Sequence, residues 1–344
     1  MSTVRTVNGR WLLRGRGGSL SAYAARDEAV WCRAERHPGL PWGPARRVGG
    51  DQRLHAGPGV GQGSDGYAHL VAWRPTVRGE SGLVHSTHFR PHLSALDWTP
   101  IGHPDKKGDR TGVPAVAVDD EGRAHVFVRN KGGGVSMVAQ KEKGGWDPWR
   151  DLEGSAVHEE LAAVTGESGR VELYAAVSGG ILHWRQQAPG EQPVLEETLE
   201  AQVRPGTLHA LATSPDSTTL LYLDESGDLC AWRPGGKPVT VLGSAGPGPV
   251  CAVRCELDGQ DCTLLAQRSA GGRAVFAAYP TGRESAGASW TESGPRLPVD
   301  AEVSLTVDAD DRVVAAAFAP STGELLLARR TDGTGLALEA WQPV

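Results

Sequence analysis

Cysteine is scarce in this chain, and long apolar runs and a strong charge of one sign are absent. Five cysteines in 344 residues are too few for a disulfide scaffold. No apolar run is long enough to cross a membrane and the N-terminus has no secretory signal pattern, so we expect a cytoplasmic protein. The net charge of −6 argues against a nucleic acid or an anionic membrane as the partner.

Recognisable catalytic motifs are also missing. The sequence contains no Gly-x-Ser-x-Gly elbow, P-loop, His-Glu-x-x-His motif or sialidase Asp box, and it has neither WD nor kelch signatures. No group of residues predicts a metal or a cofactor. Whether the protein is an enzyme therefore stays open at this point.

Glycine and proline, in contrast, are abundant. The 46 Gly and 23 Pro make up one residue in five, against roughly 12% in an ordinary chain. Helix interiors exclude both residue types, so a helical bundle or coiled coil is excluded.

Short β-like segments recur about every 47 residues. Tryptophans near the end of a unit mark five repeats: Trp42, Trp98, Trp149, Trp290 and Trp341. Turn pairs between apolar runs mark the first hairpin of six repeats: 65–66, 121–122, 168–169, 216–217, 258–259 and 310–311. A third strand is marked by related segments such as Gly179–Arg185 and Gly227–Arg233.

These repeats predict an all-β chain that forms one seven-bladed β-propeller with four antiparallel strands per blade. The expected blades are 9–50, 51–107, 108–154, 155–201, 202–248, 249–298 and 299–344. A column of small residues on the innermost strands supports this prediction: Gly59, Ala115, Ala162, Ala210, Ala252 and Ser304. Trp11 holds that place in the first blade, which must pack differently. The alternative is two β-sandwiches in tandem.

The thiols do not form a convincing metal site. Cys255 and Cys262 flank the turn Asp258-Gly259 symmetrically, so a two-residue hairpin would place them opposite each other. A disulfide between them is left open, and buried free thiols are the favoured interpretation.

Histidines gather in the second repeat at positions 55, 69, 85, 88, 92 and 103. His69, His125 and Glu172 share one strand position in consecutive repeats. His85 and His88, three residues apart, would point to opposite faces of one strand. We therefore favour surface imidazoles over metal ligands.

The most suggestive polar pattern is a column of arginines at the end of the third strands. It contains Arg33, Arg185, Arg233 and Arg329, and Trp184 and Trp232 precede two of these. A guanidinium fork beside an aromatic face suits a sugar or another small polar ligand. We predict these six residues as ligand-binding; the alternative is a solvated face with arginine stems over neighbouring blades.

The last-strand pattern, with the Gly-x-Leu-x-x-Trp-Arg strands, resembles the tectonin-like, fucose-binding lectin propellers of bacteria and fungi. Trp146-Asp-Pro-Trp149-Arg-Asp-Leu152-Glu-Gly154 is the nearest match to their Trp-x-x-Trp-x-x-Leu-Gly-Gly segment. The resemblance implies sugar pockets between adjacent blades, held by aromatic, arginine and acidic side chains. Because the repeats have diverged, we predict one specialised site instead of several equal ones.

Three functions follow as hypotheses. The favoured one is binding of a carbohydrate or glycosylated metabolite without catalysis. The second is a cytoplasmic natural-product tailoring enzyme at one mouth of the channel, whose candidate residues are His55, His209, Arg254, Asp65 and Trp11. The third is a protein-interaction platform built from the loops at 74–83 and 91–107.

Overall fold

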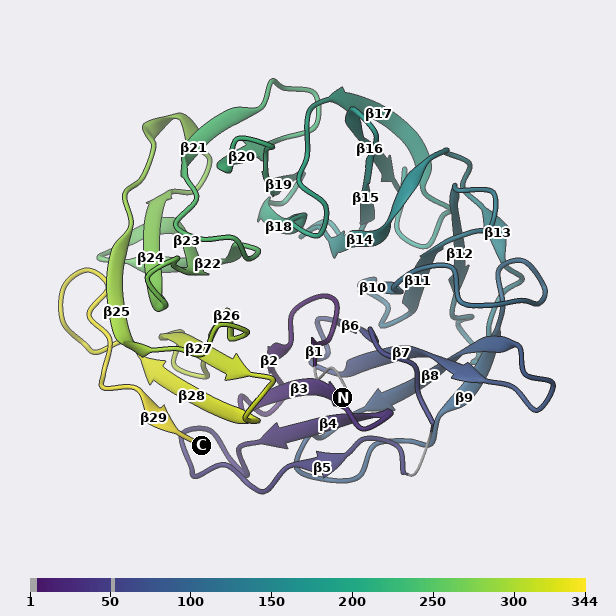
Figure 1. Ribbon diagram of the computed structural model, residues 1–344, viewed down its shortest axis with the longest axis horizontal. Coiled ribbons are helices and arrows are strands. Elements are labelled where there is room, and N and C mark those ends of the chain that lie inside the picture. The colour runs from purple at the N-terminus through teal and green to yellow at the C-terminus, as the bar shows by residue number, and fades with distance from the viewer. Residues whose placement is uncertain (1–4, 51–52) are drawn as a thin grey trace. The chain divides into compact units, whose positions relative to one another are not determined.

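Seven antiparallel β-sheets follow one another along residues 5–50 and 53–344, the part of the chain that the computed structural model describes (Figure 1). The chain falls into two compact units, residues 1–201 with four sheets and residues 202–344 with three. Each sheet is a meander in which consecutive strands pair, as expected for strands joined by short turns. The described residues contain no helix that is long and apolar enough to cross a membrane.

The first unit contains strands β1 to β17. Its first sheet comprises β1 (Arg5–Thr6), β2 (Leu12–Arg14), β3 (Leu20–Arg26), β4 (Ala29–Ala34) and β5 (Arg46–Arg47); its second comprises β6 (Gly59–Gln62), β7 (Ala68–Pro75), β8 (Ser81–His88) and β9 (Thr99–Gly102). The third comprises β10 (Ala115–Val118), β11 (Ala124–Arg129), β12 (Val135–Ala139) and β13 (Arg150–Asp151); the fourth comprises β14 (Val157–Thr165), β15 (Val171–Val177), β16 (Gly180–Arg185) and β17 (Val194–Glu200).

The second unit contains strands β18 to β29. The fifth sheet comprises β18 (His209–Ser214), β19 (Ser217–Leu223), β20 (Asp228–Trp232) and β21 (Val239–Gly243). The sixth comprises β22 (Cys251–Leu257), β23 (Gln260–Arg268), β24 (Arg273–Pro280) and β25 (Thr291–Arg296), with the 3-10 turn η1 (Glu284–Ala286) before β25. The seventh comprises β26 (Glu302–Val307), β27 (Val313–Ala319), β28 (Glu324–Arg329) and β29 (Gln342–Pro343).

This strand order confirms the predicted seven-bladed β-propeller fold and excludes the tandem sandwiches. Each sheet has four strand positions, as predicted; in the first sheet the first position is divided between two short strands, β1 and β2, which both pair with β3. The break between β1 and β2 ends at the buried Trp11, which stands where the other repeats have a small residue. Every other strand lies inside its expected blade range. Whether the two units act as a single domain stays a prediction.

The predicted hairpins form as their turn residues require. At the β22–β23 turn, Asp258 and Gly259 both adopt positive φ, the conformation of a tight two-residue hairpin. This register places Cys255 directly opposite Cys262, as predicted, and both are free, buried thiols. Burial raises the pKa of the Cys255 thiol to about 12, with a further contribution from Cys262, so the thiol is protonated at neutral pH.

The apolar core lies between consecutive sheets. One cluster joins the second sheet to the third and another joins the third to the fourth. In the second unit, two clusters join the fifth sheet to the sixth and the sixth to the seventh. Each of these sheets therefore buries its apolar side chains against the next sheet along the chain. Because the hydrophobic effect is non-directional, this burial does not by itself fix how one sheet is placed on the next.

Tryptophans fix how one sheet sits on the preceding sheet. The Trp98 indole donates to Val48 O at 2.8 Å, and the Trp149 indole donates to Ile101 O at 3.0 Å. In the second unit, the Trp290 indole donates to the carbonyl oxygen of the preceding sheet's last strand at 2.7 Å. The predicted last-strand tryptophans at these positions are thus packing residues between sheets.

A glycine opposite the tryptophan makes this contact possible. Gly49 has φ +69°, and a Cβ added there would lie 2.5 Å from Cδ1 of Trp98. In the second unit, a Cβ added at Gly294 would lie 2.7 Å from Cδ1 of Trp341. The Trp and Gly positions of the repeat are therefore two halves of one contact.

The first strands of neighbouring sheets also approach each other closely, backbone against backbone. A Cβ added at Gly61 on β6 would lie 2.6 Å from Val116 O on β10, too close for any side chain. Small residues on these strands, including the buried Ala115, thus let consecutive sheets converge at their first strands. This agrees with the column of small residues that the sequence predicted.

We expect Trp98→Ala to destabilise the protein by about 3–5 kcal/mol, because it removes a buried ring and its hydrogen bond. Trp98→Phe keeps much of the ring but leaves Val48 O unpaired, and should cost about 1–3 kcal/mol. Urea unfolding monitored by circular dichroism measures both losses. The matched control is Trp31→Phe, since Trp31 is only half-buried; equal losses for W98F and W31F would contradict the proposed role of Trp98.

We expect Gly61→Ala to destabilise the protein by about 1–3 kcal/mol or more, because the new methyl group would collide with the β10 backbone. Gly17→Ala is the control, since nothing lies within 4 Å of the added Cβ and its backbone is not left-handed. That control should be neutral or stabilising by about 0.4–1 kcal/mol. Thermal melts of both variants test the difference, and an unchanged melt for G61A would show that β6 and β10 can separate without cost.

Candidate ligand-binding site

Two of the four arginines of the predicted column, Arg185 and Arg329, form ion pairs within their own sheets. Nε of Arg185 lies 3.5 Å from Oε1 of Glu172, on the neighbouring strand β15. Nε of Arg329 lies 3.6 Å from Oδ2 of Asp308, which follows β26. Arg33 is half-buried on β4. These guanidinium groups lie in three different sheets.

Arg233 is closed off by the following sheet. Its Nη2 lies 2.9 Å from Oε1 of Glu284, in the connection between β24 and β25, and its Nε donates to Oγ1 of Thr219 at 3.2 Å. Glu284 is only 8% exposed. The Arg233 guanidinium is therefore already paired with a carboxylate of the following sheet, while its side chain stays 32% exposed.

The two predicted aromatic platforms, Trp184 and Trp232, are completely buried. The Trp184 indole donates to Leu152 O at 2.9 Å, and the Trp232 indole donates to Gly236 O at 3.1 Å. Neither ring presents a face to a ligand in this conformation. Trp184 instead supplies the contact to the preceding sheet that the fourth repeat, lacking a last-strand tryptophan, would otherwise miss.

The catalytic candidates of the first unit each make local contacts. Trp11 is buried, and Oδ1 of Asp65 accepts the Tyr67 backbone N–H at 2.9 Å. His55 lies 3.4 Å from the hydroxyl of Ser81, and burial lowers its pKa, with a further contribution from the Arg110 charge.

The candidates of the second unit are also engaged elsewhere. Arg254 forms an exposed ion pair with Asp261, with Nη2 to Oδ2 at 2.7 Å. His209 Nε2 lies 3.3 Å from the backbone of Ala252 on the next sheet. Within residues 5–50 and 53–344, no three His, Cys, Asp or Glu side chains are placed to hold a metal ion.

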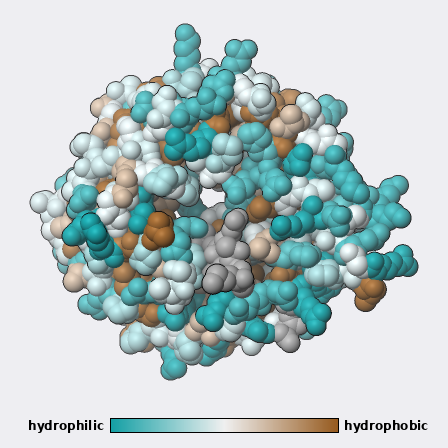
Figure 2. Space-filling model, viewed as in Figure 1, coloured by the Kyte–Doolittle hydropathy of each residue, from teal (hydrophilic) through white to brown (hydrophobic). Residues whose placement is uncertain are grey.

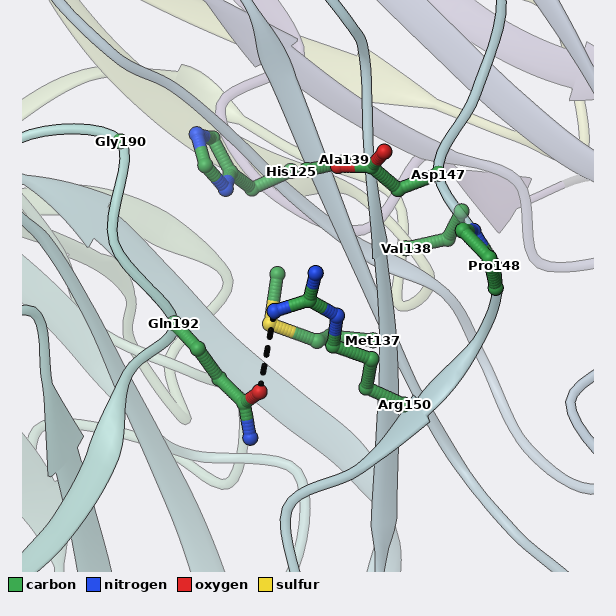
Figure 3. A pocket seen from close by; sticks show the side chains of 9 residues that line it. All are labelled: His125, Met137, Val138, Ala139, Asp147, Pro148, Arg150, Gly190 and Gln192. Atoms are coloured by element: carbon green, nitrogen blue, oxygen red, sulfur yellow. Dashed lines mark hydrogen bonds between the residues drawn. The ribbon is translucent and has the colours of Figure 1, made fainter.

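A pocket opens between the third and fourth sheets, both in the first unit (Figure 3). Its volume is about 50 Å³, small beside the roughly 300–1,000 Å³ of sites that enclose a drug-sized ligand. The pocket therefore suits one edge of a ligand whose remainder stays in solvent. It is lined by His125, Met137, Val138, Ala139, Asp147, Pro148, Arg150, Gly190 and Gln192.

Four chain segments supply these residues. Met137 on β12 pairs with Arg150 on β13, so both project from adjacent strands of the third sheet. Asp147 precedes β13, and Gln192 belongs to the connection before β17 of the fourth sheet. Nη1 of Arg150 lies 3.3 Å from Oε1 of Gln192, which bridges the two sheets (Figure 3).

His125 forms a buried part of the pocket lining. Its Nε2 donates to Oδ2 of Asp119 at 3.0 Å, and Nε of Arg123 donates to the same oxygen at 2.9 Å. Burial raises the pKa of Asp119, but hydrogen bonds from His125 and Arg123 outweigh it, so that the pKa falls to about 2. The ionised Asp119 fixes the ring, and Nδ1 of His125 has no hydrogen-bond partner among the described residues.

The neighbouring junction explains why this pocket is open. Between the second and third sheets, His69 and His85 hold the strand positions that His125 and Met137 hold in the pocket. There the Trp146 ring packs edge-on against His85, with ring centroids 5.0 Å apart. The connection of the fourth sheet brings Gly190 and Gln192 instead of an indole, which leaves space.

The sequence prediction missed this pocket but contained a signal for it. Asp147, Pro148 and Arg150 belong to the Trp146–Gly154 segment that carries the resemblance to lectin propellers. The repeat places His125 at the strand position of His69 and Glu172 but does not indicate which side chain it contacts. Gly190 and Gln192 carry no sequence signal, because their contact with the third sheet exists only after folding.

The comparisons with known proteins agree with this architecture. No protein-family model and no curated protein matches the sequence. AofleA from Arthrobotrys oligospora has a TM-score of 0.54 at 10% identity, covering 86% of this chain and 88% of that chain. The Aleuria aurantia lectin, described as fucose-specific, has a TM-score of 0.52 in its complex with Fucα1-6GlcNAc, at 13% identity, covering 85% of this chain and 98% of that chain. NanB sialidase from Streptococcus pneumoniae has a TM-score of 0.53 at 12% identity, covering 91% of this chain and 65% of that chain.

At these identities the similarity establishes the fold. The chain is a seven-bladed β-propeller, and structures similar to it include fucose-binding lectins, which matches the resemblance found in the repeats. The similar structures also include a sialidase, so similarity of fold does not distinguish a binding protein from an enzyme. The function therefore has to be argued from the site.

We expect the His69–His85 pair to make the protein sensitive to acid. Burial lowers the pKa of His69 to about 4 and, with the nearby His69, lowers that of His85 to about 3. In the unfolded chain both protonate near pH 6.5, so below that pH the unfolded state binds more protons and stability falls as pH drops towards 4. Between pH 7 and 5 the loss should be about 2 kcal/mol for each histidine.

Urea unfolding at pH 7 and pH 5 measures this loss. The double variant H69Q/H85Q should lose clearly less stability over the same interval than the wild type. H37Q, which replaces an exposed histidine, is the control and should behave like the wild type. An equal acid loss in the wild type and the double variant would show that other groups determine the acid sensitivity.

Proposed function

We propose that this protein binds a carbohydrate without catalysis, and that the pocket between the third and fourth sheets is its binding site. The observation that carries the proposal is the convergence of His125, Asp147, Arg150 and Gln192 around one small opening. A ligand edge with several hydroxyl groups can satisfy such a mixed set of donors and acceptors. Variants of the pocket residues have to distinguish carbohydrate binding in this pocket from carbohydrate binding elsewhere on the chain.

Each side chain of the pocket has a counterpart in sugar chemistry. The Asp147 carboxylate accepts hydroxyl protons, and the Arg150 guanidinium donates to hydroxyl or ring oxygens. With Nε2 committed to Asp119, Nδ1 of His125 is left as a buried polar atom without a hydrogen-bond partner among the described residues. Met137 and Pro148 provide the apolar contact for the C–H groups of a sugar ring.

The lectins that resemble this chain in fold support the proposal by analogy. The fucose-specific lectin of Aleuria aurantia, in complex with a fucosylated disaccharide, is among them. Fucosides are therefore the first ligands to test, together with other neutral sugars. The tailoring-enzyme hypothesis and the cytoplasmic location stay predictions. None of the catalytic candidates lines the pocket.

Isothermal titration calorimetry with α-methyl fucoside and a panel of neutral sugars tests the proposal. For the sugar that binds, Asp147→Asn and Arg150→Ala should each weaken affinity by about tenfold to a hundredfold, since each removes a charged hydrogen bond worth about 1.5–3 kcal/mol. Gln192→Trp should abolish binding by filling the pocket, as Trp146 fills the neighbouring junction.

Arg329→Ala is the control for a predicted arginine outside the pocket and should bind like the wild type. If R329A or R185A lost binding while D147N and R150A kept it, the arginine column would be the site and the pocket would not. Absence of binding to every sugar in the panel, with all variants folded, would count against carbohydrate binding itself.

A further inference from the structure

Charge is distributed very unevenly along this chain. Residues 1–107 contain 15 Lys and Arg against 8 Asp and Glu, a net charge of +7, so residues 108–344 carry −13. Nine of these arginines fall within the first 50 residues, which contain only three carboxylates. The first two sheets are thus basic although the whole protein is acidic.

Exposed apolar side chains concentrate in the same sheets. Eight large hydrophobic residues are exposed in the described chain, and four of them lie in two loops of the first two sheets. Leu40 is 48% exposed in the loop before β5, and Phe89, Leu93 and Leu96 are 42–52% exposed in the loop between β8 and β9. Elsewhere apolar side chains are scattered over a mainly hydrophilic surface, as on the face shown in Figure 2.

Hydrogen bonds and a ring contact place these two loops side by side. Nη1 of Arg46 on β5 donates to His92 O at 2.9 Å, and the rings of His37 and His92 lie 6.5 Å apart. The Leu40 backbone N–H in turn donates to His37 O at 3.1 Å. The exposed residues of these two adjoining loops and of the start of β5, Leu40, Arg46, Phe89, Arg90, Leu93 and Leu96, are here named the basic apolar patch.

The longer loop of the patch is held in a fixed conformation. Nε2 of His88 lies 3.0 Å from Leu93 O, and the Ser86 hydroxyl donates to Leu96 O at 2.6 Å. The Phe89 ring packs edge-on against Tyr67, with centroids 4.7 Å apart. A partner would thus meet apolar side chains on an ordered backbone, and little conformational entropy would be lost on binding.

We propose that the basic apolar patch binds a segment of another protein in which acidic side chains flank apolar ones. Apolar side chains of such a segment would cover the three leucines and Phe89, while its carboxylates would pair with the exposed Arg46 and Arg90. The apolar residues of the patch come from two loops of two sheets and are each only 42–52% exposed, which favours a protein partner over insertion into a membrane. The patch lies apart from the pocket residues, so the proposal does not depend on carbohydrate binding.

Fluorescence anisotropy with a defined probe tests this proposal. The probe is a short labelled peptide in which leucines alternate with pairs of glutamates, and its counterpart carries lysine in place of each glutamate. The full-length protein should bind the acidic peptide, with affinity falling as salt rises, and should not bind the lysine peptide. R46E/R90E and, separately, L93S/L96S should each weaken binding by about tenfold or more.

R296E and V299S are the controls, because they make the same kinds of change at exposed positions of the second unit. Both should bind the acidic peptide like the wild type. Equal binding of the acidic and lysine peptides, or unchanged binding by both patch variants, would overturn the proposal. So would binding to phosphatidylserine vesicles without binding to the peptide, or burial of the patch by self-association in analytical ultracentrifugation.

Discussion

The contact between a tryptophan of one sheet and a glycine of the preceding sheet is the interaction on which this structure depends. The indole N–H of Trp98 or Trp149 satisfies a backbone carbonyl at the end of the preceding sheet's last strand, and the ring needs the space that a glycine leaves. Each four-stranded sheet is too small to bury its apolar faces alone, so its stability comes from its neighbours. The Trp–Gly contact fixes the distance and the orientation between two consecutive sheets, which the non-directional burial of apolar side chains does not.

That contact also explains why sites arise between sheets. Once consecutive sheets are fixed, the connection before the last strand lies over the preceding sheet, and its side chains decide what happens there. Trp146 fills one junction by packing on His85, and Glu284 closes another by pairing with Arg233. At the junction of the third and fourth sheets, Gly190 and Gln192 leave a polar pocket open. The same architecture thus yields closed and open junctions through one short, variable segment.

The outcome for Trp184 shows what the sequence could and could not predict. Its position at the end of a third strand was predictable, because the repeat places it one residue before an arginine. The contact of its indole with Leu152 was not, since Leu152 lies 32 residues earlier in another sheet. The arginines show the same limit: Glu172 was recognisable as a neighbour of Arg185, but Glu284 as the partner of Arg233 was not. Conversely, Cys255 and Cys262 were paired correctly because only a two-residue turn separates their strands.

By itself the sequence determined the number and order of the sheets and the pairing of consecutive strands within them, because turn residues and alternating apolar positions act over a few neighbouring residues. It also determined that the first two repeats are basic and the rest acidic. Only the tertiary structure decided which junction opens, since that depends on side chains such as His125, Met137 and Gly190 meeting across two sheets. It likewise decided that the predicted tryptophans are buried supports, because burial is a property of packing and not of a residue type.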